Sequence, residues 1–229
     1  MTRRLIAIDG PAASGKSSTA ALVAERLGWA HLDSGSLYRA LTLAALDHLG
    51  DPAAQAWSGQ RVVALADQLP VRLVLRDATF LPEVAGVDVG EALRSDAVTA
   101  AVSRLAALPD VRTWVNERQR EAVRDHAGVV VDGRDIGTVV FPEAPLKVFL
   151  VASPAERARR RLAQRGREPD AGEVAREAER LAVRDQADAT RLVAPLRPAP
   201  DAVVMDTTSL LLEEQVARIV ALARECGLG

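Results

Sequence analysis

The sequence is poor in cysteine and in long apolar runs, and each shortage excludes a class of protein. Cys226 is the single cysteine among 229 residues, which excludes a disulfide framework and a cysteine-rich metal site and suits a reducing cytoplasm. No apolar run approaches the roughly 18 residues that a membrane-spanning helix needs. No signal peptide is expected either, because Thr2-Arg3-Arg4 leads directly into a short strand pattern.

An excess of charge of either sign is also missing. The 29 basic and 31 acidic residues give a net charge of −2 at pH 7, so neither a nucleic-acid backbone nor an anionic membrane is the expected partner. Hydrophobic residues make up 48% and charged residues 26% of the chain, as in ordinary globular proteins. The length fits one sizeable α/β domain with room for an insertion, and we expect a cytoplasmic monomer.

The chain does contain an alternation of short apolar runs with helical patterns. Leu5-Ile6-Ala7-Ile8 is a continuous apolar run, typical of a strand buried on both faces, and the helical pattern after it stops at Gly28. Such alternation predicts a parallel sheet covered by helices on both faces. Further strands are expected at about 29–32, 128–132, 146–151 and 202–205, and further helices at about 36–49, 91–107, 110–126, 154–164, 172–187 and 209–225.

The spacing of apolar residues changes its period between about residues 69 and 90. Residues 71–76 and 79–81 have the composition of short strands, separated by Asp77-Ala78 and followed by Pro82. Two short strands joined by a tight connection predict a small antiparallel β insertion.

Lysine is rare, since only Lys16 and Lys147 are lysines among the 29 basic residues. Lys16 occupies the required position of G-x-x-x-x-G-K-[ST], a loop whose backbone N–H groups converge on nucleotide phosphates. We expect Lys16 to reach the β- and γ-phosphates, and the hydroxyl of Ser17, or alternatively Ser18, to ligate Mg²⁺. The phosphate loop predicted to bind the nucleotide comprises Gly10, Pro11, Ala12, Ala13, Ser14, Gly15, Lys16, Ser17 and Ser18.

Two classes of nucleotide-binding protein are not supported by the rest of the sequence. A GTPase needs an Asn/Thr-Lys-x-Asp element, but Lys147 lies inside an apolar strand pattern. A transporter-type ATPase carries Ser-Gly-Gly-Gln, which residues 57–60 imitate only weakly, and we interpret them as a loop or helix start. A small-molecule kinase needs a second anion site at the carboxyl edge of the sheet. Polar residues that follow predicted strands at that edge are Asp33, Ser34, Arg39, Arg134 and Asp135.

Arginines flank a break in the helical pattern at 166–170, which we interpret as a lid. Three of them, Arg159, Arg160 and Arg165, are expected to be solvated charges of the lid or of a helix face. The arginines around the break are Arg157, Arg159, Arg160, Arg161, Arg165 and Arg167.

Four segments together resemble the bacterial cytidylate kinase family: "GPAASGKSS" (10–18), "LDSGSLYRA" (32–40), "VVVDGRDIGTVVFPEAPLKVFL" (129–150) and "RDQADATRLVAPL" (184–196). The resemblance covers essentially the whole chain, and the DGRD-x-GTVVFP stretch is its most selective part. It implies a three-layer α/β/α P-loop kinase with a five-stranded parallel sheet, a small antiparallel β insertion in the acceptor-binding domain, and a lid. It implies a single domain over 1–229, with a core at 1–35, 100–157 and 190–229, an acceptor-binding region at about 36–99 and a lid at about 158–172.

The resemblance also implies transfer of the γ-phosphate of ATP to CMP or dCMP, with Mg²⁺ on the donor phosphates. The attacking atom is then a phosphate oxygen, so catalysis is expected from positioning and charge neutralisation without a general base. Asp33 through a water molecule and Asp132 are alternative carboxylates for Mg²⁺ beside Ser17. The catalytic cations implied by the resemblance are Lys16, Arg134, Arg157 and Arg161.

For the acceptor nucleotide, the resemblance implies three groups of residues. Guanidinium groups suit bidentate contact with the α-phosphate, and a carboxylate can accept from a ribose hydroxyl. A second carboxylate would face the N4 amino group of cytosine and repel O4 of uracil. These residues are Ser34, Arg39, Arg134 and Arg191 for the phosphate, Arg184 and Asp188 for the ribose, and Ser103, Arg112 and Asp135 for the base.

Two other functions stay open at this point. One is a P-loop kinase for a different small acceptor, such as UMP or a hydroxylated metabolite. The other is a regulatory or binding module that holds a nucleotide without transferring its phosphoryl group.

Overall fold

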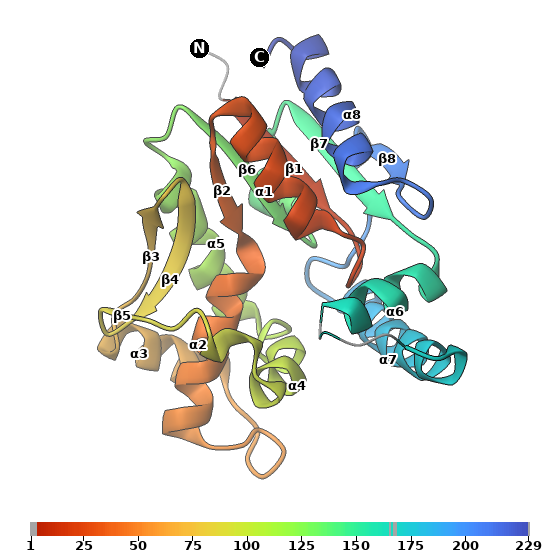
Figure 1. Ribbon diagram of the computed structural model, residues 1–229. Helices are drawn as coiled ribbons and strands as arrows, with labels where there is room; N and C mark the ends of the chain where they lie inside the picture. The colour runs from red at the N-terminus through yellow and green to blue at the C-terminus, as the bar shows by residue number, and fades with distance from the viewer. Residues whose placement is uncertain (1–3, 165, 167–168, 229) are drawn as a thin grey trace. The chain divides into compact units, whose positions relative to one another are not determined.

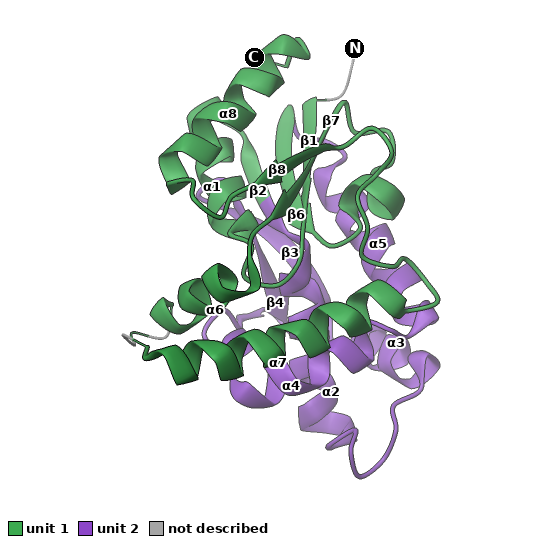
Figure 2. Ribbon diagram, turned by 90° about the vertical axis from the view of Figure 1, so that its right-hand side faces the viewer, with its two compact units in different colours: residues 1–31, 127–229 green, residues 32–126 purple. Residues whose placement is uncertain are grey.

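The computed structural model describes residues 4–164, 166 and 169–228, and the chain divides into two compact units (Figure 2). Unit 1 comprises residues 1–31 and 127–229, and unit 2 comprises residues 32–126. Arg165 and Arg167 of the predicted lid lie outside the described residues. The boundaries drawn from the sequence for the core, the acceptor-binding region and the lid stay predictions.

Unit 1 is built on a parallel sheet (Figure 1). Strand β1 (Arg4–Asp9) pairs in parallel with β6 (Gly128–Gly133) and with β7 (Leu146–Val151), and β7 pairs in parallel with β8 (Val203–Asp206). Strand β2 (Ala30–Asp33), which begins in unit 1, is the neighbour of β6, so the order is β2-β6-β1-β7-β8. The five predicted strands of the sheet are therefore all present, and the predicted fold class is confirmed.

Helices α1 (Lys16–Leu27) and α8 (Leu212–Glu225) share one apolar core with this sheet. Helix α1 ends at Gly28 as predicted, and the left-handed backbone there (φ +67°) is a conformation that glycine adopts without strain. The core between the sheet and these helices contains Ile6, Ile8, Val23, Val130, Val148, Leu150, Val216 and Ile219.

Helices α6 (Pro154–Ala163) and α7 (Ala171–Thr190) form a second helix pair of unit 1. Ser153 caps α6 by accepting a hydrogen bond from Glu156 N, and Pro154 occupies its first turn, where no intrahelical N–H partner is needed. Asp170 and Glu173 form a capping box at the start of α7. Both helices begin within one residue of the predicted positions.

Unit 2 combines four helices with the antiparallel strands predicted between residues 69 and 90. Strand β3 (Val71–Arg76) pairs with β4 (Thr79–Val84), and β4 pairs with the short β5 (Val87–Asp88), which confirms the insertion. The helical core of unit 2 includes Leu37, Leu41, Val102, Leu105, Val111 and Val115. The helices are α2 (Ser34–Leu49), α3 (Gly59–Gln68), α4 (Asp96–Leu105) and α5 (Pro109–Val123), with a short 3-10 turn at Ala92–Arg94.

Two elements of unit 2 differ from the sequence-based expectation. Helix α3 was not predicted as a helix; residues 57–60, interpreted as a loop or helix start, lead into it, and Ser58 caps it by accepting from Arg61 N. Strand β4 also continues through Pro82, which was expected to end it. Pro82 is the register partner of Leu73 in the pairing of β3 with β4.

Candidate functional site

The phosphate loop lies between β1 and α1, in the strand–loop–helix context that its motif requires. A Cβ on Gly10 would lie 2.4 Å from the Leu150 carbonyl oxygen, so only glycine fits where the loop leaves the sheet. Gly15 is the N-cap of α1 and has a left-handed backbone (φ +92°). Lys16 is buried, and its Nζ donates to Pro11 O at 3.0 Å. That bond holds the ammonium group against the loop.

Asp132 contacts this loop through its carboxylate. It is fully buried at the end of β6, and its Oδ2 accepts a hydrogen bond from Ser17 Oγ at 2.6 Å. Its Oδ1 lies 2.8 Å from His31 Nε2. Asp33, the alternative carboxylate, is instead the N-cap of α2, where it accepts from Gly35 N at 2.8 Å. Ser17 and Ser18, the two alternative hydroxyl residues, are both exposed.

A second group of contacts holds the phosphate loop against α6 and α7 at Ala12, which we call the loop crest. Arg157 is buried on α6, donates to Ala12 O at 3.1 Å and forms an ion pair with Asp185 of α7. Asp185 Oδ1 in turn accepts from Ala12 N at 3.0 Å. Arg157 is therefore placed at the loop, but Asp185 was not predicted as a site residue.

The expectation that Arg160 is a solvated charge is wrong. Its Nη1 donates to Ser14 O at 3.3 Å and to Thr207 Oγ1 at 3.0 Å, and its Nε donates to Glu156. These bonds form because Arg160 lies on the face of α6 that is turned toward the phosphate loop. Arg159, by contrast, has a side chain that is 60% exposed, as expected, and Arg161 is half-buried on the same helix.

Four of the predicted acceptor residues lie together in unit 1, and we call them the acceptor cluster: Arg134, Asp135, Asp188 and Arg191. Arg134 Nε lies 3.0 Å from Asp188 Oδ2, Arg191 Nη2 lies 3.5 Å from Asp135 Oδ1, and Arg191 Nη1 lies 3.9 Å from Asp188 Oδ1. No side chain of the cluster is more than 18% exposed. Arg184 is half-buried one turn before Asp188 on α7.

The turn that follows Asp135 is held by Asp9, the last residue of β1. Asp9 Oδ1 accepts from Ile136 N at 2.9 Å and Oδ2 accepts from Gly137 N at 2.8 Å, within a π-helical turn over Ile136–Val140. Burial raises the pKa of Asp9 from 3.8 to about 6, although the two hydrogen bonds act in the opposite direction. The sequence indicated Asp9 only as a break in an apolar run.

The alkyl stem of Lys147 supports the same turn. A Cβ on Gly137 would lie 3.1 Å from Lys147 Cδ and 3.5 Å from Asp9 Oδ2, so the turn approaches both side chains closely. Lys147 is buried in β7, and its Nζ binds Asp201 at 2.7 Å. The second lysine of the chain therefore packs against the turn that follows Asp135.

The remaining predicted acceptor residues lie in unit 2. Ser34, the first residue of α2, accepts from Gln119 Nε2 at 3.0 Å through its hydroxyl. Arg39 Nη1 donates to Leu93 O at 2.9 Å and to Thr99 Oγ1 at 3.0 Å. Gln119 was not predicted, although a glutamine inside an apolar helix face is a detectable signal.

The two residues of unit 2 that were assigned to the base lie on α4 and α5. Ser103 is half-buried on α4. Arg112 is buried on α5, with its guanidinium carbon 5.7 Å from the ring centroid of Tyr38, a cation–π distance. Its Nη1 also donates to Ala106 O at 3.3 Å.

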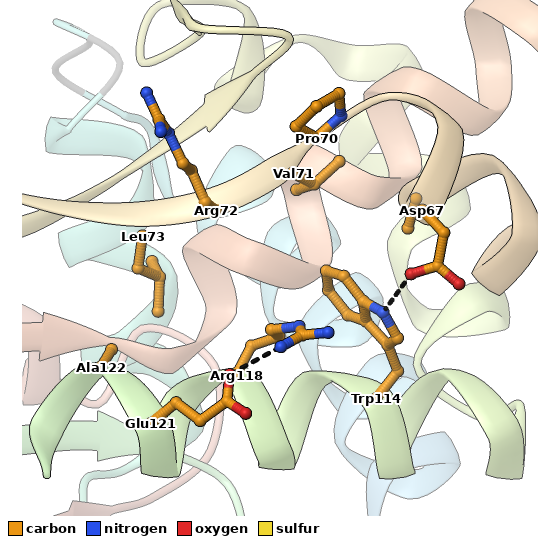
Figure 3. A pocket seen from close by; sticks show the side chains of 10 residues that line it. Asp67, Pro70, Val71, Arg72, Leu73, Trp114, Arg118, Glu121 and Ala122 are labelled. Carbon is orange, nitrogen blue, oxygen red and sulfur yellow. Dashed lines mark hydrogen bonds and ion pairs between the residues drawn. The ribbon is translucent and has the colours of Figure 1, made fainter.

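Unit 2 also has a pocket of about 470 Å³ between α3, β3 and α5 (Figure 3). Trp114 Nε1 donates to Asp67 Oδ1 at 3.3 Å there, and Arg118 lies over the Trp114 ring at 5.3 Å. No residue predicted from the sequence lines this pocket. Ser34, Arg39 and Ser103 are not among its lining residues.

Two classes of feature are missing from the part of the chain that the structure describes. None of the helices there combines the length and the apolar character needed to cross a membrane. Residues 4–164, 166 and 169–228 also contain no cluster of three or more His, Cys, Asp or Glu side chains that could hold a metal ion.

Comparison with known proteins points to one family. The family model described as cytidylate kinase matches residues 6–225. A cytidylate kinase from Stutzerimonas stutzeri is 47% identical over 219 residues, which cover 95% of this chain and 93% of that protein. Cytidylate kinases from Pectobacterium atrosepticum and Serratia proteamaculans are each 42% identical, covering 96% and 98% of this chain and 96% of each relative.

Proposed function

This chain belongs to the cytidylate kinase family, and from that premise we propose that it transfers the γ-phosphoryl group of ATP to CMP or dCMP. The products are ADP and CDP or dCDP. The observation that carries the proposal is the pairing of a phosphate loop containing Lys16 with a buried acceptor cluster containing Arg134 and Arg191 in the same unit. A phosphotransferase needs both a donor and an acceptor anion site.

At the donor site, we propose that the loop amides and Lys16 bind the β- and γ-phosphates. The acceptor is itself a phosphate, so no side chain has to remove a proton, and the work of the site is positioning and neutralisation of charge. Arg157 donates to the loop at Ala12 O, and we assign it, with Arg161, to the transferring phosphoryl group. Arg134 neutralises charge from the acceptor side.

Magnesium would fit beside Ser17 and Asp132. Hydroxyl and carboxylate oxygens are ligands that Mg²⁺ accepts, together with water and phosphate oxygens, and the two side chains are already joined by a 2.6 Å hydrogen bond. When bound, Mg²⁺ would partly neutralise the charge of the donor phosphates. Because Asp33 caps α2, we propose Asp132 as the carboxylate in place of the predicted Asp33.

At the acceptor site, we propose that Arg134 and Arg191 bind the α-phosphate and that Arg184 and Asp188 contact the ribose. Asp135 would accept from the N4 amino group of cytosine, a donor that uracil lacks. The residues of unit 2 that the sequence assigned to the acceptor remain proposals: Ser34 and Arg39 for the phosphate, and Ser103 and Arg112 for the base.

We further propose a cytoplasmic monomer that needs neither nucleic acid nor a membrane. The single cysteine and the net charge of −2 support this proposal. Size-exclusion chromatography with light scattering would test the oligomeric state directly.

A coupled assay of ADP release over an acceptor panel tests the activity. CMP and dCMP are expected to be phosphorylated at least tenfold more efficiently than UMP or AMP, because a carboxylate facing O4 of uracil is repelled. Equal rates with UMP would favour a kinase of different acceptor specificity. Binding of ATP and CMP without ADP formation would instead favour a non-catalytic module.

A further inference from the structure

Helix α7 contacts the phosphate loop and the acceptor cluster through two aspartates spaced three residues apart. Asp185 binds the loop crest at Ala12, and Asp188 binds Arg134 at the end of β6. Residues at positions i and i+3 lie on the same helix face, so one face of α7 contacts both sites. All of these residues belong to unit 1.

The contact at the loop is both polar and apolar. Asp185 accepts from Ala12 N at 3.0 Å while Arg157, paired with Asp185, donates to Ala12 O at 3.1 Å. Both backbone polar groups of Ala12 are therefore held by side chains of α6 and α7. The Ala12 side chain is buried with Ala158 of α6 and Leu181 of α7. The position of the loop crest thus depends on the position of α7.

The contact at the acceptor cluster is ionic and largely buried. Asp188 lies 3.0 Å from Arg134 Nε and 3.9 Å from Arg191 Nη1, and its side chain is 10% exposed. Arg191 follows directly after the last residue of α7 and reaches Asp135 at 3.5 Å. A displacement of α7 therefore moves Asp188 and Arg191 together.

We propose that Asp185 is a positioning residue that couples the two substrate sites through α7, so that a nucleoside triphosphate on the phosphate loop raises the affinity of the acceptor cluster for a nucleoside monophosphate. The inference rests on the proposed function. Two ligands are coupled when both bias the same structural element. A triphosphate fixes the loop crest, Asp185 transfers that restraint to α7, and α7 sets the Asp188–Arg134 pair that receives the monophosphate.

The test is a measurement of CMP binding by calorimetry with and without a saturating, non-hydrolysable ATP analogue and Mg²⁺. In the wild type, the analogue is expected to tighten CMP binding about fivefold or more, a typical coupling between sites. Asp185→Asn keeps the size of the side chain and removes its charge, so the ratio of the two dissociation constants is expected to fall close to one. CMP binding without the analogue is expected to change less than threefold.

Glu179→Gln is the matched control, because it removes a negative charge from an exposed position of the same helix. It is expected to keep the wild-type ratio. Asp185→Glu retains the carboxylate and is expected to give a ratio between those of the wild type and Asp185→Asn. Should Asp185→Asn fail to fold by circular dichroism, the wild type decides alone, and equal CMP affinity with and without the analogue would contradict the coupling.

The coupling and the activity fail in different ways. A wild type that phosphorylates CMP but binds it equally well with and without the analogue overturns the coupling alone. An Asp185→Asn variant with the wild-type ratio also overturns it. A wild type that neither binds nor phosphorylates CMP overturns the proposed function, and the coupling with it.

Discussion

Ser17 Oγ donates a hydrogen bond to Asp132 Oδ2 over 2.6 Å, which joins the phosphate loop to the carboxyl end of β6. Asp132 also binds His31, so its carboxylate has a fixed orientation. If this pair holds Mg²⁺, Asp132→Asn is expected to raise the Mg²⁺ concentration for half-maximal activity about 10- to 100-fold. A magnesium titration at saturating ATP and CMP measures the effect.

Asp33→Asn is the control for that titration. Asparagine caps a helix about as well as aspartate, so the variant keeps the start of α2, where Asp33 accepts from Gly35 N. Its magnesium requirement is expected to remain within twofold of the wild type. An equal or larger shift in Asp33→Asn would return the metal assignment to Asp33.

Asp188 is expected to distinguish the ribose from the deoxyribose substrate, but incompletely. Its proposed bond to the 2′-hydroxyl exists only with CMP, whereas its ion pair with Arg134 would position the proposed phosphate site for both substrates. Asp188→Asn is therefore expected to raise KM for both, by about tenfold more for CMP than for dCMP, as one charge-assisted hydrogen bond predicts. Steady-state kinetics with both acceptors measures the effect. Equal increases in KM for CMP and dCMP would contradict the proposed contact between Asp188 and the ribose.

Asp9 gives the stability of the protein a specific pH dependence. Its pKa is about 6 in the folded chain against 3.8 ordinarily, chiefly because of burial, so the folded state binds the proton more tightly than the unfolded state. The contribution of Asp9 to the free energy of unfolding is then fully present below about pH 4 and is lost as the pH rises through about 6. The loss is on the order of 3 kcal/mol.

The side chain in Asp9→Asn does not titrate, so comparing the variant with the wild type isolates the contribution of Asp9 to the pH dependence of stability. The charged groups that act on Asp9 are Asp135 and Lys16, and both are unchanged in the variant. Urea unfolding at pH values from 4 to 7 should show the wild type losing stability relative to Asp9→Asn across that window. Parallel curves for the two proteins would contradict the shifted pKa.

Gly10→Ala tests the closest approach in the phosphate loop. The added Cβ would meet the Leu150 carbonyl oxygen at 2.4 Å, so the backbone must move. We expect KM for ATP to rise at least tenfold, with a loss of about 1–3 kcal/mol in stability. Kinetics and thermal unfolding measure the two effects.

Gly28→Ala is the comparison for Gly10→Ala. Gly28 has φ +67°, and a Cβ added there would meet no atom within 4 Å, so alanine costs about 1 kcal/mol of stability through its backbone alone. KM for ATP is expected to be unchanged. A similar rise in KM for both variants would mean that lost stability, rather than loop geometry, weakens ATP binding.

The residues predicted from the sequence are those whose position follows from a short segment. The phosphate loop is specified by adjacent residues, and Arg134 and Asp135 by the end of a strand. Asp185 and Ala12 are 173 residues apart, and nothing local separates Asp185 from the other acidic residues of α7. Arg160 likewise differs from Arg159 only in the helix face on which it lies.

Local patterns also fail where a distant residue imposes the conformation. The turn over Ile136–Val140 is π-helical because Asp9, more than 120 residues earlier, accepts the N–H groups of Ile136 and Gly137. Helix α3 had a detectable signal, since Val62 and Ala66 are buried four residues apart. The residues at its start, Ser58 and Gly59, were interpreted as a loop or helix start, and the helix that follows was not predicted.

The scarcity of lysine makes chemical modification a selective reporter of this protein. Its two ε-amino groups are both buried, one bonded to Pro11 O in the phosphate loop and the other to Asp201. An amine-directed acylating reagent therefore has two possible side-chain targets, Lys16 in the phosphate loop and Lys147 as an internal reference. Protection of Lys16 by a bound triphosphate can be read from the ratio of the two modified peptides, without any engineered label.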